Sequence, residues 1–231
     1  MYYQTLYYSR VKEALIFILV FTAFLFVVFG SLWGGFSEDY TARLLSGVIA
    51  TSVLSDGIFS IGQLFKRYYS SGLIKVLKKR PHKIIYHHLG TALSHFIILS
   101  VVSLVIHVIG LFVFNIEMSI QSFIQIELGI LVGSIVFSTL GLFVAFVNKE
   151  GQINQGLANI VQFSLLFSSE AYYSVSNLNE TLHQVADYLP LNHILYLMRG
   201  QEVNWWVLLI WTSVCTIGFM IMFNRYQYQR V

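Results

Sequence analysis

The feature that most constrains this sequence is a series of six long apolar stretches, separated by short segments that hold most of the charge. A helix needs about 20 apolar residues to cross a hydrocarbon core about 30 Å thick, and each stretch reaches about that length. Charged residues make up only 11% of the chain, against about 25% in ordinary globular proteins, so the apolar excess must face lipid. We therefore predict an all-α integral membrane protein, a single transmembrane domain of residues 1–231, with transmembrane helices at 14–36, 43–65, 89–114, 122–147, 152–173 and 203–224.

The basic residues predict the orientation of these six helices. Cytoplasmic loops of membrane proteins carry an excess of Lys and Arg. If the N-terminus is placed in the cytoplasm, twelve of the fourteen Lys and Arg residues fall on the cytoplasmic side. Only Arg43 and Arg199 then lie outside, whereas most loop carboxylates are external. We expect both termini to be cytoplasmic.

Two further segments are helical in pattern but too short to span a membrane. Residues 1–13 are rich in tyrosine ahead of Arg10 and Lys12, which is typical of a helix lying in the headgroup layer. Residues 177–200 read as two short helices that meet at Pro190 and end at Gly200. We predict an extracellular re-entrant hairpin before the last span. The alternative is a pair of helices lying flat on the outer surface.

A strongly basic segment, 66–83, connects the second and third spans and carries seven of the fourteen Lys and Arg residues. As a helix it would place Leu73, Ile74 and Leu77 on one side and Lys75 and Lys78 on the other. Such an amphipathic helix is compatible with two kinds of binding. It could lie on anionic lipid, or it could dock into a groove on a cytoplasmic protein.

These features together resemble the ABC-2 type permeases, the membrane subunits of ABC transporters, over essentially the whole chain. In that family a cytoplasmic coupling helix follows charged residues, contains a glycine and ends near a proline. By this resemblance the coupling residues, which contact an ATPase subunit, are Lys66, Arg67, Gly72, Leu73, Ile74, Lys75, Leu77, Lys78 and Pro81. The family usually has acidic residues beside the glycine, where this chain has Tyr69–Ser71 and Lys75. The basic helix therefore favours an acidic groove in the partner.

The resemblance implies two cytoplasmic ABC ATPase subunits, which bind ATP and Mg, and a second permease subunit in a homodimer or heterodimer. It also implies a bacterial cell membrane location. The sequence gives an independent argument for a separate ATPase, because a phosphate-binding P-loop needs a Gly-Lys pair and none of the sixteen glycines is followed by Lys. We expect no cofactor on this chain, no enzymatic activity of its own and no nucleic-acid partner.

Three carboxylates, Asp56, Glu127 and Glu170, fall within or at the ends of predicted spans. A carboxylate in the membrane usually faces protein or water, because its exposure to lipid costs about 2.5–3.5 kcal/mol at the bilayer centre. Together with Pro190 and His193 of the hairpin, they are our candidates for the translocation pathway. For Asp56, a cavity-lining role and a structural hydrogen bond to a neighbouring helix are equally favoured. For Glu127 and Glu170, a structural or interfacial role is favoured.

Catalytic and metal sites are not indicated. His95 and His107 lie about 120° apart around the third span, which prevents them from sharing a metal. The single cysteine, Cys215, lies in an apolar stretch, and no His-Glu-x-x-His motif is present. Gly129, Gly133 and Gly141 form one face of the fourth span. We interpret that face as a helix-packing surface, more probably within the subunit than between subunits.

The functional hypothesis is an ATP-driven exporter in which the coupling helix rocks the first, second and fifth spans about a pathway. Few charges line the spans, so an amphipathic or lipid-like substrate is expected, first a peptide toxin or bacteriocin, or a drug as in antibiotic resistance. Two alternatives remain. One is export of a lipid-linked glycan or glycolipid, and the other is an ion-coupled secondary transporter that uses Asp56, although the two halves of the chain show no convincing repeat.

Overall fold

The computed structural model of this protein describes residues 12–34, 38–72, 84–116, 119–147, 155–173 and 180–228. Within these ranges the chain forms helices and no strand. The elements are α2 (Lys12–Trp33), α3 (Glu38–Ser55), the π-helical segment η2 (Asp56–Ile61), α4 (Gly62–Ser70), α6 (Ile84–Phe114), α7 (Ile120–Val147), α8 (Gln155–Phe167), α9 (Glu180–Ala186), α10 (Pro190–Met198) and α11 (Trp205–Tyr228).

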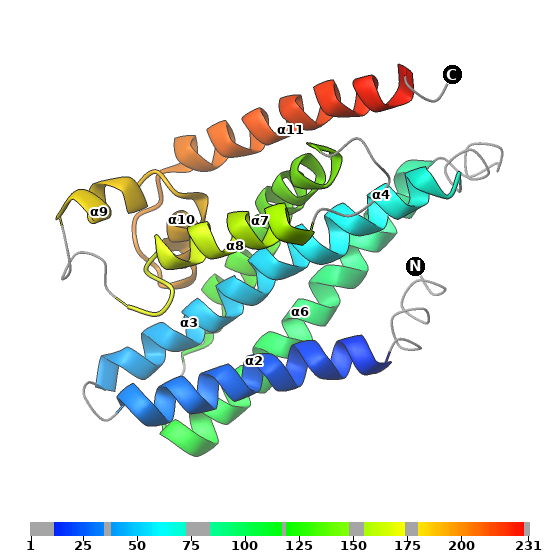
Figure 1. Ribbon diagram of the computed structural model, residues 1–231. Helices are drawn as coiled ribbons and strands as arrows, with labels where there is room; N and C mark the ends of the chain where they lie inside the picture. The colour runs from blue at the N-terminus through cyan, green and yellow to red at the C-terminus, as the bar shows by residue number, and fades with distance from the viewer. Residues whose placement is uncertain are drawn as a thin grey trace.

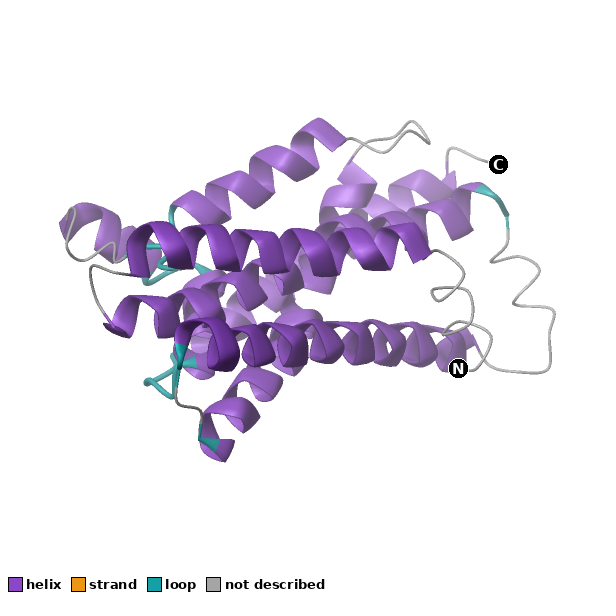
Figure 2. Ribbon diagram, turned by 90° about the horizontal axis from the view of Figure 1, so that it is seen from below, coloured by secondary structure: helices purple, strands orange, loops and turns teal. Residues whose placement is uncertain are grey.

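The long helices run alongside one another in an elongated bundle (Figures 1 and 2). The start of α2 and the ends of α4 and α11 lie on the right of Figure 1, whereas α9 lies at the opposite end. Four helices are long and apolar enough to cross a membrane, namely Tyr40–Ser70, Gly90–Phe114, Ile120–Val147 and Trp205–Asn224. The apolar helices at Leu19–Trp33 and Gln155–Phe167 are shorter. The predicted all-helical membrane protein is confirmed, and the six-span count remains a prediction.

Helix α7 lies at the centre of the packing and contacts η2, α4, α10 and α11. Phe137 and Ile130 of α7 are fully buried, in one core cluster with residues of α3 and α10. By contrast, α6 and α11 expose large apolar side chains, such as Phe112 at 77% and Val214 at 61%. An apolar surface of this kind is stable in lipid rather than in water.

The glycine face of α7 packs against other helices of the same chain. A Cβ atom at Gly141 would collide with the carbonyl of Gly57 in η2, and one at Gly129 would collide with Met198. Gly133 faces Val53 and Ile194. Small residues here let the helix backbones approach closely, and the expectation of packing within the subunit is confirmed.

The predicted ends of the second and fifth spans differ from the structure. The second span was expected to end at residue 65, but the helix continues through α4 to Ser70 and is followed by a turn at Gly72, which has a φ of +72°. Lys66 and Arg67 therefore belong to α4. The fifth span was expected to reach residue 173, but α8 ends at Phe167. Beyond it the backbone amide of Glu170 donates to the side chain of Asn192 at 2.9 Å, not to a helical carbonyl.

The segment before the last span contains two short helices, α9 and α10, as the proline pattern predicts. Pro190 lies in the first turn of α10, where its missing N–H leaves no helical bond unmade. After α10 the chain turns at Gly200, whose φ of +68° favours glycine. The depth of this pair in the membrane, and with it the re-entrant interpretation, remains a prediction.

Candidate functional site

The candidate residues fall into three regions along the bundle: the end at α4, a middle region at η2 and the end at α10. We call the first the inner end and the last the outer end, after the orientation that the sequence predicts. Arg43, near the start of α3, and Lys66, in α4, belong to one continuous helical run. At 1.5 Å per residue, a helix separates two such positions by about 35 Å, which is about the thickness of a membrane.

The inner end holds the first three of the predicted coupling residues. Lys66 is buried, with 1% of its surface exposed, Arg67 is exposed, and Gly72 adopts a left-handed backbone conformation. The other predicted coupling residues lie outside the described part of the chain, namely Leu73, Ile74, Lys75, Leu77, Lys78 and Pro81.

An aromatic cluster joins this end of α4 to two other helices, and sequence reasoning missed it. The ring of Tyr69 lies 4.6 Å from that of Phe223 in α11 and 6.1 Å from that of Phe146 in α7. Phe146 in turn contacts Phe219 at 5.3 Å. Edge-to-face geometry at these distances adds about 0.5–1.5 kcal/mol per pair beyond apolar burial. Because these rings pack α4 against α7 and α11, we expect a movement of α4 to displace both helices.

In the middle region Asp56, the first residue of η2, pairs with His95 of α6. The Nδ1 atom of His95 lies 2.9 and 2.8 Å from the two carboxylate oxygens. Both residues are buried, Asp56 with 9% and His95 with 2% of its surface exposed. The pairing satisfies a carboxylate that would otherwise be isolated in an apolar region. The structural hydrogen bond considered for Asp56 is therefore present.

Asp56 also lines a cavity of 250 Å³ between α2, η2 with the end of α3, and α8. The polar part of its lining includes Thr22, which contacts Ser52 at 3.0 Å, and Gln162, which donates to Ser55 at 2.8 Å. The apolar part of the lining comes from Phe21, Leu25, Val48 and Phe59. Asp56 thus lines a cavity as well as pairing with His95, and its place in a translocation pathway remains a prediction.

Glu127 lies elsewhere, at the contact of α7 with α6. It accepts a hydrogen bond from Ser100 at 2.6 Å, and its other oxygen is buried without a hydrogen-bond partner among the described residues. Nearby, His107 donates to the carbonyl of Ser103 at 2.7 Å and packs edge-on against Phe123. Neither Glu127 nor His107 lines the cavity beside Asp56.

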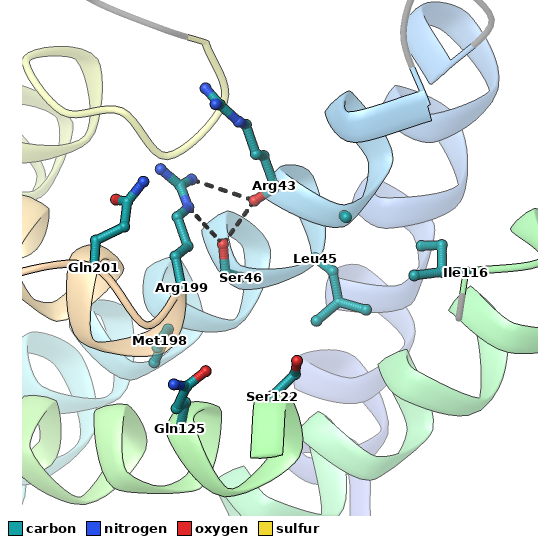
Figure 3. A pocket seen from close by; sticks show the side chains of 10 residues that line it. Arg43, Leu45, Ser46, Ile116, Ser122, Gln125, Met198, Arg199 and Gln201 are labelled. Carbon is teal, nitrogen blue, oxygen red and sulfur yellow. Dashed lines mark hydrogen bonds between the residues drawn. The ribbon is translucent and has the colours of Figure 1, made fainter. Parts of the chain in front are cut away.

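At the outer end Arg199, the residue that follows α10, is the centre of a polar network. It donates to Ser46 at 2.9 Å and to the carbonyl of Arg43 at 3.3 Å (Figure 3). It also donates to the carbonyl of Glu170 at 2.9 Å, and its guanidinium lies 4.0 Å from the Glu170 carboxylate. The pKa of Arg199 is lowered to about 10, chiefly by burial and also by the charge of Arg43, while Glu170 and Tyr196 oppose the shift.

The remaining hairpin candidates belong to the same network. Pro190 is buried at the start of α10, and His193 donates from Nε2 to the carbonyl of Asp187 at 2.8 Å. Tyr196 donates to the Asp187 carboxylate at 3.1 Å, and burial raises the pKa of Tyr196. The structure thus brings Glu170, Pro190 and His193 together, apart from Asp56 and Glu127. Sequence reasoning treated Arg199 only as an external charge, since its partners lie up to 156 positions away.

Comparison with known protein families identifies the membrane component of a transporter. The family described as ABC-2 type transporter matches residues 1–203, which include every predicted candidate residue. No curated protein matches the sequence.

Proposed function

This chain belongs to the ABC-2 type transporter family, and from that premise we propose that it is the permease of an ATP-driven exporter of amphipathic substrates. The family places it in the membrane as a transport component, which works with an ABC ATPase. A peptide toxin, bacteriocin or drug with a positively charged group is the substrate that we propose. Six transmembrane helices, a second permease subunit and a bacterial cell membrane complete the proposal.

The cavity beside Asp56 is the observation that supports this class of substrate. Its apolar lining residues suit a hydrocarbon or aromatic surface, and its hydroxyl groups with one carboxylate suit a polar, cationic group. A buried carboxylate attracts a positive charge more strongly than an exposed one, because the surrounding dielectric constant is low. The three helical regions that line this cavity correspond to the first, second and fifth predicted spans, the set expected to move during transport.

The aromatic cluster supports the mechanical part of the proposal. Tyr69 lies within the predicted coupling segment, residues 66–83, and contacts α7 and α11 through Phe146 and Phe223. When the ATPase closes on its nucleotide, force on the coupling segment reaches α4 first and these two helices next. Because α4 continues into η2 and α3, the same force reaches Asp56 and the cavity.

Uptake into inside-out membrane vesicles tests the proposal. Vesicles that contain the permease and its ATPase should accumulate a fluorescent cationic amphipathic peptide when ATP is supplied, and should not with a non-hydrolysable analogue. Asp56→Asn should reduce uptake of the cationic peptide more than that of a neutral peptide of equal length. Uptake that proceeds without an active ATPase would contradict the proposal.

The Asp56–His95 pair favours one second candidate, a proton-coupled transporter, since a buried acid and imidazole can exchange a proton. The same vesicles separate the two functions. Collapse of the proton gradient with ATP present should leave uptake intact if ATP drives transport. It should abolish uptake if protons drive it.

A further inference from the structure

A second cavity, of 380 Å³, lies at the outer end of the bundle beside Arg199 (Figure 3). Its walls come from the start of α3, the residues after α6, the start of α7 and the end of α10 with the turn after it. The polar lining residues are Arg43, Ser46, Ser122, Gln125, Arg199 and Gln201. None of the proposed transport steps uses this cavity.

The lining of this cavity is positively charged. Arg43 and Arg199 both contribute to it, and the described residues that line it include no Asp or Glu. The charge of Arg43 helps to lower the pKa of Arg199, which means that the two cations repel each other, and the Glu170 carboxylate, 4.0 Å from Arg199, balances only part of their charge. An anion between them would relieve this repulsion. The other polar groups, from two serines and two glutamines, can all donate hydrogen bonds to an anion.

The cavity also adjoins a surface that faces lipid. On α7, Ile120, Ile124 and Leu128 are exposed, at 81%, 52% and 47%. At about 100° per residue these three positions share one face of the helix, and Gln125 lies beside it. Gln125 points toward the cavity in Figure 3. A molecule whose acyl chains lie along this apolar face can therefore place its head group among the arginines.

We propose that this outer cavity binds the phosphate group of an anionic lipid from the outer leaflet. Arginine is well suited to the task, because its planar guanidinium donates to phosphate through parallel hydrogen bonds. Lys cannot match that geometry. Binding here fixes α3, α7 and the turn after α10 to one another. This inference does not depend on the identity of the exported substrate or on the driving force.

Thermal unfolding of the purified full-length protein in detergent tests the proposal. Phosphatidylglycerol should raise Tm more than phosphatidylcholine of the same acyl chains, because a ligand that binds only the folded state stabilises it. Glycerol phosphate and inorganic phosphate, which carry the anion without acyl chains, should have little effect at the same concentration. If the free phosphates raised Tm as much as phosphatidylglycerol does, the anion would not come from a lipid and the proposal would be wrong.

Three variants test whether the stabilisation by phosphatidylglycerol comes from this cavity. Arg43→Gln should weaken the apparent affinity for phosphatidylglycerol about tenfold, in line with the loss of one charged hydrogen bond. Ser122→Trp fills the cavity without a change of charge and should remove the preference for phosphatidylglycerol. Val185→Trp places the same ring on an exposed position of α9, away from the cavity, and should leave the preference unchanged. An unweakened affinity in Arg43→Gln, or full retention of the preference in Ser122→Trp, would overturn the proposal.

Discussion

Asp56 and His95 lie 39 positions apart in the sequence, and the imidazole Nδ1 meets the carboxylate at 2.8 Å inside the helical bundle. The contact joins η2 to α6 at the point where the helix from Glu38 to Ser70 changes to π-helical geometry. π-Helical turns inside α-helices often occur at functional sites. Here the turn places Asp56 both against His95 and in the wall of the cavity.

The first prediction concerns the stability of this pair. His95→Ala should lower the free energy of unfolding by about 3–5 kcal/mol, because removal of one partner leaves the other buried without compensation. The double variant Asp56→Asn/His95→Asn should recover a large part of the loss, since both groups are then neutral and of similar size. Thermal unfolding in detergent measures both. Strictly additive losses would show that the two side chains do not stabilise each other.

The second prediction concerns Arg199. Arg199→Lys keeps the charge but loses the forked geometry that reaches Ser46 and the carbonyls of Arg43 and Glu170. We expect a loss of about 3 kcal/mol in unfolding free energy, because hydrogen bonds from charged groups contribute about 1.5–3 kcal/mol each. Arg43→Lys serves as the control and should change stability little, since only the backbone carbonyl of Arg43 accepts from Arg199. Equal losses in the two variants would contradict this account of the network.

Sequence reasoning identified those features of the fold that are encoded locally. The apolar stretches give the helices, and Pro190 and Gly200 mark the start and the end of one short helix and its turn. Boundaries set by tertiary contacts were missed. After α8 ends at Phe167, the amide of Glu170 bonds to Asn192, 22 positions along the chain, and no local pattern reveals that bond.

The same distinction applies to the candidate site. Asp56 was identified because a carboxylate in an apolar stretch is conspicuous by composition alone. Its partner His95 was considered only as a metal ligand, because pairing between helices depends on their relative rotation in three dimensions. The aromatic cluster around Tyr69 was likewise hidden, since in an apolar sequence Phe146 and Phe223 look like any other lipid-facing residues.

The third prediction concerns that cluster. Phe223→Ala removes the ring that lies closest to Tyr69 and also contacts Phe146. We expect fewer peptide molecules to be transported per ATP hydrolysed, because α11 no longer follows α4. Phe163→Ala, on an exposed position of α8, is the matched control and should leave this ratio unchanged. An unaltered ratio in Phe223→Ala would remove the cluster from the proposed transmission of force.

The last prediction concerns residues 73–83 of the coupling segment, which lie outside the described part of the chain, and it rests on the sequence. Leu73→Asp and Leu77→Asp should each uncouple ATP hydrolysis from transport, because a carboxylate on the apolar side of the helix disfavours burial in the partner's groove. Leu73→Ile and Leu77→Ile keep that side apolar and should retain coupling. Lys75 and Lys78, on the opposite side, should cross-link to the ATPase subunit with an amine-reactive reagent. Transport that is unchanged in both aspartate variants, or cross-links that reach only phospholipid, would instead favour a helix lying on the membrane surface.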